Sequence, residues 1–153
     1  NKSLRLVLVG DGKEKDNLMN LAGQLGISDR VEFRGFLSGQ ALRECYKTAG
    51  AFVLPTREDC FGLVLIEAMC AGLPIIVSQY SDGAAETVTE DVNGYIVDPY
   101  DTAQFTQAID RTFTDEQTRK RLGTAGCEAT EKFRFENVAA GYLEAIEDAL
   151  SRR

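Results

Sequence analysis

The sequence contains no histidine, and its four cysteines show no CxxC spacing. Because zinc sites are built mainly from closely spaced cysteines and histidines, the sequence shows no recognisable zinc pattern. Three aspartates, Asp11, Asp82 and Asp98, invite a metal cluster, but neither helical nor strand spacing brings them together, so we predict no metal site. We expect reduced thiols, since no secretory signal is recognised. The cysteines lie at positions 45, 60, 70 and 127.

Positive charge is also scarce, since 17 lysines and arginines stand against 24 acids and give a formal net charge of -7. This balance argues against general attraction to nucleic acid or to an anionic membrane, so any anionic ligand must be held locally. The longest apolar runs are only a few residues, whereas about 20 are needed to span a bilayer. We therefore expect a cytoplasmic chain with no nucleic-acid partner.

With 153 residues and 44% hydrophobic content, the chain is long enough for one compact domain and too short for two ordinary ones. We therefore predict a single domain over residues 1–153. Short apolar runs typical of β-strands alternate with amphipathic helical patterns up to residue 97, and three helices follow. The predicted strands are 4–9, 31–33, 51–54, 74–78 and 94–97, and the last three helices are 102–113, 115–130 and 135–150.

This alternation favours parallel pairing of the strands. The predicted fold class is α/β, a three-layer α/β/α sandwich with a parallel Rossmann-like sheet. In such folds the ligand cleft lies at the carboxyl ends of the strands. The segments that follow the predicted strands are therefore the first places to look for a site.

The segment from residue 55 to residue 74 carries the clearest site signal. Gly62 precedes an apolar helix, and a glycine there lets backbone and ligand approach closely. The first helical N–H groups have no intrahelical partner, and no Ser, Thr, Asn or Asp directly precedes Leu63 and Val64, so we expect both amides to be open to a pyrophosphate. Asp59 lies in the turn before the helix and Glu67 about one turn after Leu63, so both carboxylates can face one cleft.

A simpler interpretation is that Asp59 caps the helix and Glu67 is a solvated acid. The context favours a binding role instead. Glu67 is flanked by Ile66, Ala68 and Met69 in a helix that leads to an apolar strand, an element that we expect to be mostly covered. A carboxylate in such a place needs partners, and ribose or hexose hydroxyls would supply them.

Two further segments follow predicted strands. The run Gly10-Asp11-Gly12 lacks the third glycine of a dinucleotide fingerprint, because Lys15 occupies that place, so an ordinary tight turn is favoured. Gly10 can still line the cleft by its position. Phe36 and Leu37 follow the second strand and can present backbone groups and an aromatic face to a nucleobase, although Phe36 is equally consistent with a core position.

Taken together, these segments resemble the C-terminal, nucleotide-sugar-binding domain of family 4 retaining glycosyltransferases of the GT-B fold, the glycosyl transferases group 1. The resemblance implies that Asp59 contacts hydroxyls of the donor sugar, that Glu67 holds the ribose, and that Phe36 and Leu37 sit against the base. The residues that carry it are 7–12, 31–35, 55–74, 93–94 and 99–101. The positions expected to bind the donor nucleotide are Gly10, Phe36, Leu37, Phe61, Gly62, Leu63, Val64 and Glu67.

The sequence departs from the family in three respects. The family usually has Glu where Asp59 stands, so either this shorter carboxylate or the neighbouring Glu58 contacts the sugar. The phosphate-gripping Arg and Lys of the family lie ahead of Asn1, and the N-terminal acceptor domain is missing. The resemblance therefore implies the donor-binding lobe of a larger enzyme, one that binds weakly and is inactive by itself. A histidine near the reacting centre often belongs to the missing domain.

By the same resemblance, the parent enzyme transfers a hexosyl group from a nucleoside-diphosphate sugar, such as UDP-glucose or GDP-mannose, to an acceptor hydroxyl, with retention and without a metal or another cofactor. Such enzymes often use lipid-linked acceptors, so the parent can work peripherally at the cytoplasmic membrane face. We also expect exposed apolar surface to cause self-association of the chain.

Two alternatives stay open. One is a lobe of a nucleotide-sugar epimerase with the same bilobal architecture. The other is a non-catalytic nucleotide-binding or receiver module. A receiver needs an acceptor aspartate after its third strand, whereas here the third predicted strand ends in Leu54-Pro55-Thr56.

Overall fold

The computed structural model describes residues 4–152. Its internal contacts divide the chain into two compact units, Asn1–Lys47 and Thr48–Arg153, and each unit is described by itself. The expectation of a single domain over residues 1–153 stays a prediction.

The first unit contains a two-stranded parallel sheet with one helix between its strands. Leu6 pairs with Val31, and Leu8 pairs with Phe33. Gly26, with a left-handed φ of 64°, follows α1 and ends it as a C-terminal glycine does. The elements are β1 (Leu6–Val9), α1 (Lys15–Gln24), the 3-10 turn η1 (Ser28–Arg30), β2 (Val31–Gly35) and α2 (Gly39–Thr48), whose last residue belongs to the second unit.

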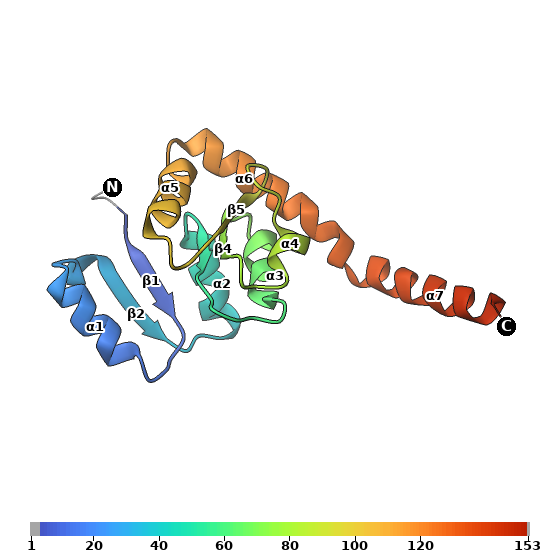
Figure 1. The fold of residues 1–153 in the computed structure, drawn as a ribbon, viewed down its shortest axis with the longest axis horizontal. Helices are drawn as coiled ribbons and strands as arrows, with labels where there is room; N and C mark the ends of the chain where they lie inside the picture. The colour runs from blue at the N-terminus through green and yellow to red at the C-terminus, as the bar shows by residue number, and fades with distance from the viewer. Residues whose placement is uncertain (1–3, 153) are drawn as a thin grey trace. The chain divides into compact units, whose positions relative to one another are not determined.

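The second unit contains a three-stranded parallel sheet in the order β3-β4-β5 (Figure 1). The α/β class with parallel strands is thus confirmed, and the five strands fall into two parallel sheets. The elements that build this sheet are β3 (Phe52–Leu54), α3 (Leu63–Cys70), β4 (Ile75–Ser78), α4 (Ala84–Thr87) and β5 (Gly94–Val97). The elements that follow are α5 (Thr102–Thr112), α6 (Glu116–Ala129), the 3-10 turn η2 (Thr130–Phe133) and α7 (Phe135–Ser151).

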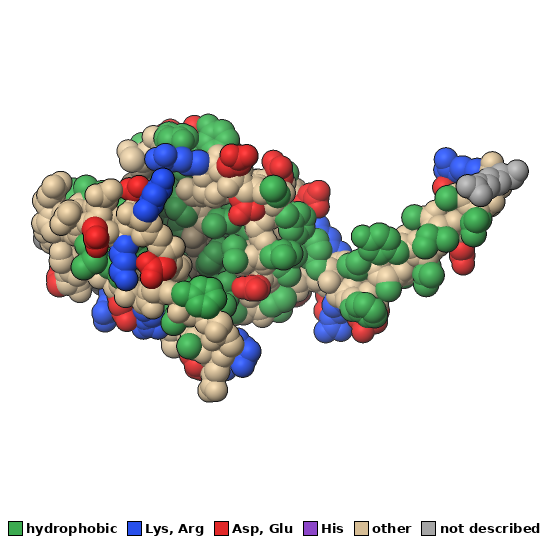
Figure 2. Space-filling view, turned by 90° about the horizontal axis from the view of Figure 1, so that it is seen from below, with side chains coloured by type: hydrophobic (Ala, Val, Ile, Leu, Met, Phe, Trp, Pro, Cys, Tyr) green, Lys and Arg blue, Asp and Glu red, His purple; other side chains and the backbone are tan. Residues whose placement is uncertain are grey.

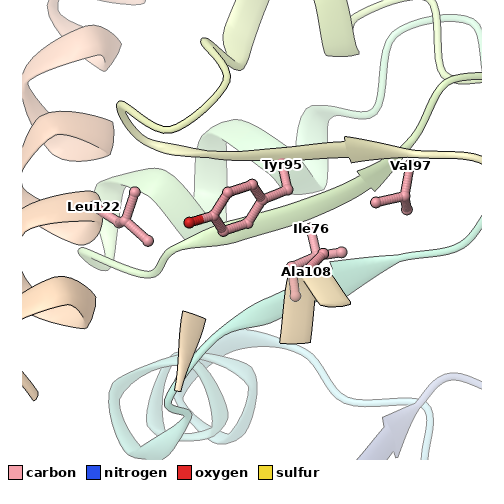
Figure 3. Close-up of a cluster of buried hydrophobic side chains, with 5 residues drawn as sticks. All are labelled: Ile76, Tyr95, Val97, Ala108 and Leu122. Atoms are coloured by element: carbon pink, nitrogen blue, oxygen red, sulfur yellow. The ribbon is translucent and has the colours of Figure 1, made fainter. Parts of the chain in front are cut away.

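The core of the second unit surrounds β4, every residue of which is buried. Both α3 and α6 contact β4, while α5 contacts β5. An uninterrupted apolar strand is typical of a sheet that is covered on both faces. Figure 3 shows the central cluster of buried side chains, which is made of Ile76, Tyr95, Val97, Ala108 and Leu122.

Aspartates cap the two helices that follow β5. The Asp101 carboxylate accepts hydrogen bonds from the N–H groups of Ala103 and Gln104 at 2.9 and 3.0 Å. The Asp115 carboxylate accepts one from the N–H of Thr118 at 2.6 Å. These bonds satisfy N–H groups that have no partner within the helix, so the sequence itself sets where α5 and α6 begin.

The last helix, α7, carries an exposed apolar stripe. Figure 2 shows hydrophobic side chains gathered along it, and none of its described residues is buried. Self-association through such surface stays a prediction. Within residues 4–152, no helix combines the length and the apolar character needed to cross a membrane. The exposed large residues of α7 are Phe135, Val138, Tyr142, Leu143, Ile146 and Leu150.

A turn before β5 is held by an ion pair. Asp91 has a left-handed φ of 61° and accepts a hydrogen bond from Arg111, whose guanidinium also lies 4.6 Å from the centre of the Tyr95 ring. Arg121 donates to the Asp91 carbonyl at 2.8 Å. The hydrogen bond from Arg111 lowers the pKa of Asp91 below its ordinary value. The charged form of Asp91 is therefore favoured in the folded chain.

This lowered pKa predicts a loss of stability in acid. Because the pKa of Asp91 is lower in the folded than in the unfolded chain, its contribution is complete above the unfolded pKa and is lost as the pH falls through the folded pKa. We expect the difference in unfolding free energy between the unmodified chain and Asp91→Asn to shrink between about pH 6 and about pH 2.5. Asparagine tolerates the left-handed backbone, so this variant isolates the charge. Urea unfolding across a pH series measures the difference, and a gap that does not change with pH would contradict the prediction.

Candidate functional site

The N-terminus of α3 is open, as the sequence predicted. Gly62 is its N-cap residue, with φ 73° and ψ 60°, and no side chain caps this end of the helix. The Gly62 carbonyl accepts a hydrogen bond from Leu65 N–H at 2.8 Å. Among the described residues, the N–H groups of Leu63 and Val64 have no acceptor. Two free amides at the positive end of a helix form a site that suits a phosphate.

Glycine is required at two points around this turn. A side chain at Gly62 would have to adopt a left-handed conformation that residues other than glycine rarely take. A Cβ on Gly83 would lie 1.8 Å from the Phe61 carbonyl oxygen, so only a glycine permits the segment before α4 to approach the turn so closely. The Asp82 N–H also donates to the Asp59 carbonyl at 3.0 Å. The turn from Asp59 to Gly62 is therefore held against residues 81–83.

Asp59 shapes this turn and does not cap the helix. Its Oδ1 atom accepts a hydrogen bond from Phe61 N–H at 2.9 Å, and the side chain is half-buried. Among residues 4–152, nothing donates to its second oxygen, Oδ2. Glu58 is exposed, and its backbone is held by two hydrogen bonds with the Thr56 hydroxyl, at 2.7 and 3.3 Å. Both carboxylates thus stay candidates for the sugar contact.

The expectation that Glu67 lies on a covered part of α3 is wrong. Glu67 is exposed, and the helix buries Leu65, Ala68 and Met69 instead. Residues 65, 68 and 69 lie on one face, whereas residues 63 and 67 lie four apart on another. Leu63 is also exposed, at 69%. The spacing prediction therefore holds, since Glu67 lies one turn beyond the open amides, but burial does not force a ligand on it.

Phe61 contributes its backbone to the turn, while its side chain packs within the second unit. Its ring meets the Phe133 ring edge-on, with centroids 6.1 Å apart. The structure therefore brings Phe61 together with four other predicted binding positions and with Asp59 in one short stretch. These four positions are Gly62, Leu63, Val64 and Glu67.

The remaining predicted positions belong to the first unit. Gly10 has a φ of 128° and donates its N–H to the Gly35 carbonyl at 2.7 Å, which ties the ends of β1 and β2. It also lines a hollow of about 280 Å³ together with residues of the following turn and of α1. Phe36 is 80% exposed, so the core interpretation of its ring is wrong, and Leu37 is half-buried. An exposed ring after β2 is available for stacking on a base.

Sequence reasoning missed a polar aromatic cluster at the carboxyl ends of the second sheet. Arg57 follows β3, Tyr80 follows β4 and Tyr100 follows β5. The two tyrosine rings meet at 6.0 Å, and the Arg57 guanidinium lies 5.7 Å from the Tyr100 ring centre. Arg57 makes no ion pair with any described residue. Its place after a strand was the one signal that could have marked it.

Nothing in the described part of the chain builds a metal centre. No group of three or more Cys, Asp or Glu side chains in residues 4–152 is arranged to hold an ion. The absence of a metal requirement nevertheless stays a prediction. None of the four cysteines, all of which lie within residues 4–152, forms a disulfide, and their reduced state stays a prediction.

Comparisons with known proteins point to one family. The family model described as "Glycosyl transferases group 1" matches residues 1–129. An uncharacterised glycosyltransferase of Methanocaldococcus jannaschii is 35% identical over 136 residues, which cover 88% of this chain and 35% of that protein. A D-inositol 3-phosphate glycosyltransferase of Stackebrandtia nassauensis is 32% identical over 155 residues, which cover 98% of this chain and 35% of that protein. The chain thus spans about a third of the length of these curated relatives.

Solved structures agree with this assignment. Sucrose-phosphate synthase from Thermosynechococcus elongatus superimposes with a TM-score of 0.82 at 30% identity, over 97% of this chain and 39% of that one. Anabaena HepE, solved in complex with UDP, superimposes with a TM-score of 0.83 at 24% identity, over 95% and 41%. The second likeness shows the fold alone. The open helix, the parallel sheets and the family match converge, and the chain belongs to the glycosyl transferases group 1 family.

Proposed function

We propose that this chain is the donor-binding lobe of a retaining glycosyltransferase that transfers a hexosyl group from a nucleoside-diphosphate sugar to an acceptor hydroxyl. The observation that carries the proposal is the uncapped N-terminus of α3. There Gly62 leaves the amides of Leu63 and Val64 without acceptors in the described part of the chain, and the carboxylates of Asp59 and Glu67 flank them.

Each part of a sugar nucleotide has a counterpart among these residues. The two free amides and the positive end of α3 suit the distal phosphate. Glu67, one turn along the same face, suits the ribose hydroxyls, which donate hydrogen bonds to a carboxylate. Asp59 or Glu58 accepts from hydroxyls of the sugar. Structural neighbours support this ligand class, since HepE was solved with UDP-glucose as well as with UDP.

The chemistry proposed for this lobe is positioning and charge stabilisation. As the bond between the sugar and the diphosphate breaks, negative charge grows on the departing phosphate. Helix-terminal amides that are already oriented stabilise this charge without reorganisation, and no metal is required for that role. The acceptor and its recognition belong to the rest of the parent enzyme.

The isolated chain should bind its donor weakly and catalyse no transfer. The cationic phosphate contacts that the family resemblance implies are not among these residues, and each missing contact with a charged group forfeits about 1.5–3 kcal/mol. Titration with UDP, GDP, UDP-glucose and GDP-mannose, followed by NMR or calorimetry, tests the proposal. Binding of none of these at millimolar concentration would refute it.

Glu67→Ala is expected to weaken UDP binding about 10-fold while leaving the binding of inorganic pyrophosphate unchanged. The reason is that Glu67 faces the ribose, which pyrophosphate lacks. Calorimetry with both ligands measures the two affinities.

Glu144→Ala serves as the control. Glu144 is an exposed acid on α7, so this substitution removes the same charge at a place away from α3. Its affinities should match those of the unmodified chain. An equal loss of UDP and pyrophosphate binding in Glu67→Ala would contradict a ribose role.

A further inference from the structure

Ser81 has a buried hydroxyl with no hydrogen-bond partner. The residue is 2% exposed, and its Oγ is the one buried side-chain nitrogen or oxygen atom among the described residues that lacks a hydrogen-bond partner. The neighbouring buried serine, Ser78, is different, because its Oγ accepts a hydrogen bond from Tyr80 N–H at 3.1 Å. An unpaired buried hydroxyl destabilises a fold, so its presence calls for a reason.

The hydroxyl lies against Gly62, the N-cap residue of α3. A Cβ on Gly62 would be 3.2 Å from Ser81 Oγ. A β-bridge joins Ser81 to Asp59 at the other end of the same turn. Ser81 therefore packs against the turn from Asp59 to Gly62, the turn that precedes the open amides of Leu63 and Val64.

Three unpaired groups around Gly62 can each donate a hydrogen bond. The N–H groups of Leu63 and Val64 have no acceptor among residues 4–152, and the Ser81 hydroxyl has none either. An acceptor that reaches all three groups would therefore satisfy each of them. An anionic oxygen is the strongest acceptor available to such donors, because charge-assisted hydrogen bonds are shorter and stronger than neutral ones.

We propose that the Ser81 hydroxyl is a further ligand of the diphosphate and donates a hydrogen bond to a phosphate oxygen held at the N-terminus of α3. This inference rests on the proposed function, because it assigns one more residue to the same site. The hydroxyl is covered in the free chain, so the turn from Asp59 to Gly62 must shift when the anion binds. Gly62 can absorb such a change, because glycine tolerates many backbone conformations.

The test compares Ser81→Ala with Ser78→Ala in the 153-residue chain. Ser81→Ala should leave the melting temperature of the free chain unchanged or raise it, because it removes an unpaired polar group. It should also weaken the binding of both UDP and inorganic pyrophosphate about 10-fold. Ser78→Ala removes a hydroxyl that is already bonded within the fold, so it should lower the melting temperature and leave both affinities within about twofold.

Calorimetry and thermal unfolding supply the two readouts. If the unmodified chain binds UDP but Ser81→Ala binds it equally well, the role of Ser81 is refuted while the proposed function stands. If the unmodified chain binds neither UDP nor GDP nor pyrophosphate, both fail together. Ser81→Cys, nearly the same size with only a weak donor, repeats the test if the alanine variant does not fold, and it should lose affinity as well.

Discussion

Gly123→Ala is expected to lower the free energy of unfolding by about 3 kcal/mol, although alanine is the better helix former. Gly123 lies inside α6, and a Cβ there would be 2.0 Å from the Gly72 carbonyl oxygen. The obstructing atom belongs to the backbone of the turn between α3 and β4, so no side-chain rotation can relieve the overlap. Either α6 or this turn must move, and α6 contacts the buried strand β4 while the turn leads directly into it.

Gly141→Ala provides the matched control, because Gly141 is also inside a helix but a Cβ there meets nothing within 4 Å. We expect this variant to stabilise the chain by about 0.5–1 kcal/mol, since alanine loses less conformational entropy than glycine on forming a helix. Urea unfolding followed by circular dichroism measures both variants. Effects of the same sign would show that α6 does not approach the turn as closely as the structure indicates.

Leu65→Ala is expected to cost about 3 kcal/mol, because it empties a fully buried position in α3. The site should suffer as well. The Leu65 side chain packs against Gly62, since a Cβ on Gly62 would lie 3.2 Å from Leu65 Cδ1. With this support removed, the turn before α3 loses part of its packing, and we expect nucleotide binding to weaken together with stability.

Leu63→Ala is the control for Leu65→Ala, because it makes the same leucine-to-alanine change in the same helix at an exposed position. Leu63 lies two residues earlier on the same helix and is 69% exposed, so its truncation should change the free energy of unfolding by less than about 0.5 kcal/mol. Denaturant unfolding of the two variants side by side gives the comparison. Similar losses in both would mean that α3 does not bury the face that the structure assigns to it.

The elements themselves were predictable, because their signals are local. Strand β5 and helix α7 follow from runs of apolar residues and from their spacing, and both lie within one residue of the predicted ends. The open end of α3 was predictable for the same reason. Gly62 and the residues next to it show directly that a glycine, and no capping side chain, precedes the helix. A glycine at this place readily adopts the left-handed backbone that the structure shows.

The predictions failed where tertiary packing decides which side of an element is buried. Helix α3 is apolar at nearly every position, so its sequence does not mark which face is buried, and Glu67 was placed on the covered side. For Phe36, the sequence allowed either a core position or a contact with the base, because an aromatic residue after a strand is compatible with both. Contacts between distant segments settle such cases, and the exposures of Glu67 and Phe36 show the outcome.

The sequence by itself determined the α/β class, the family and the phosphate-shaped turn, because each depends on residues that are neighbours along the chain. Only the tertiary structure decided which glycines are indispensable and which hydroxyl has no partner. Gly83, Gly123 and Ser81 matter because segments far apart in the sequence meet there, and the distances at those meetings are set by the packing of whole helices and strands.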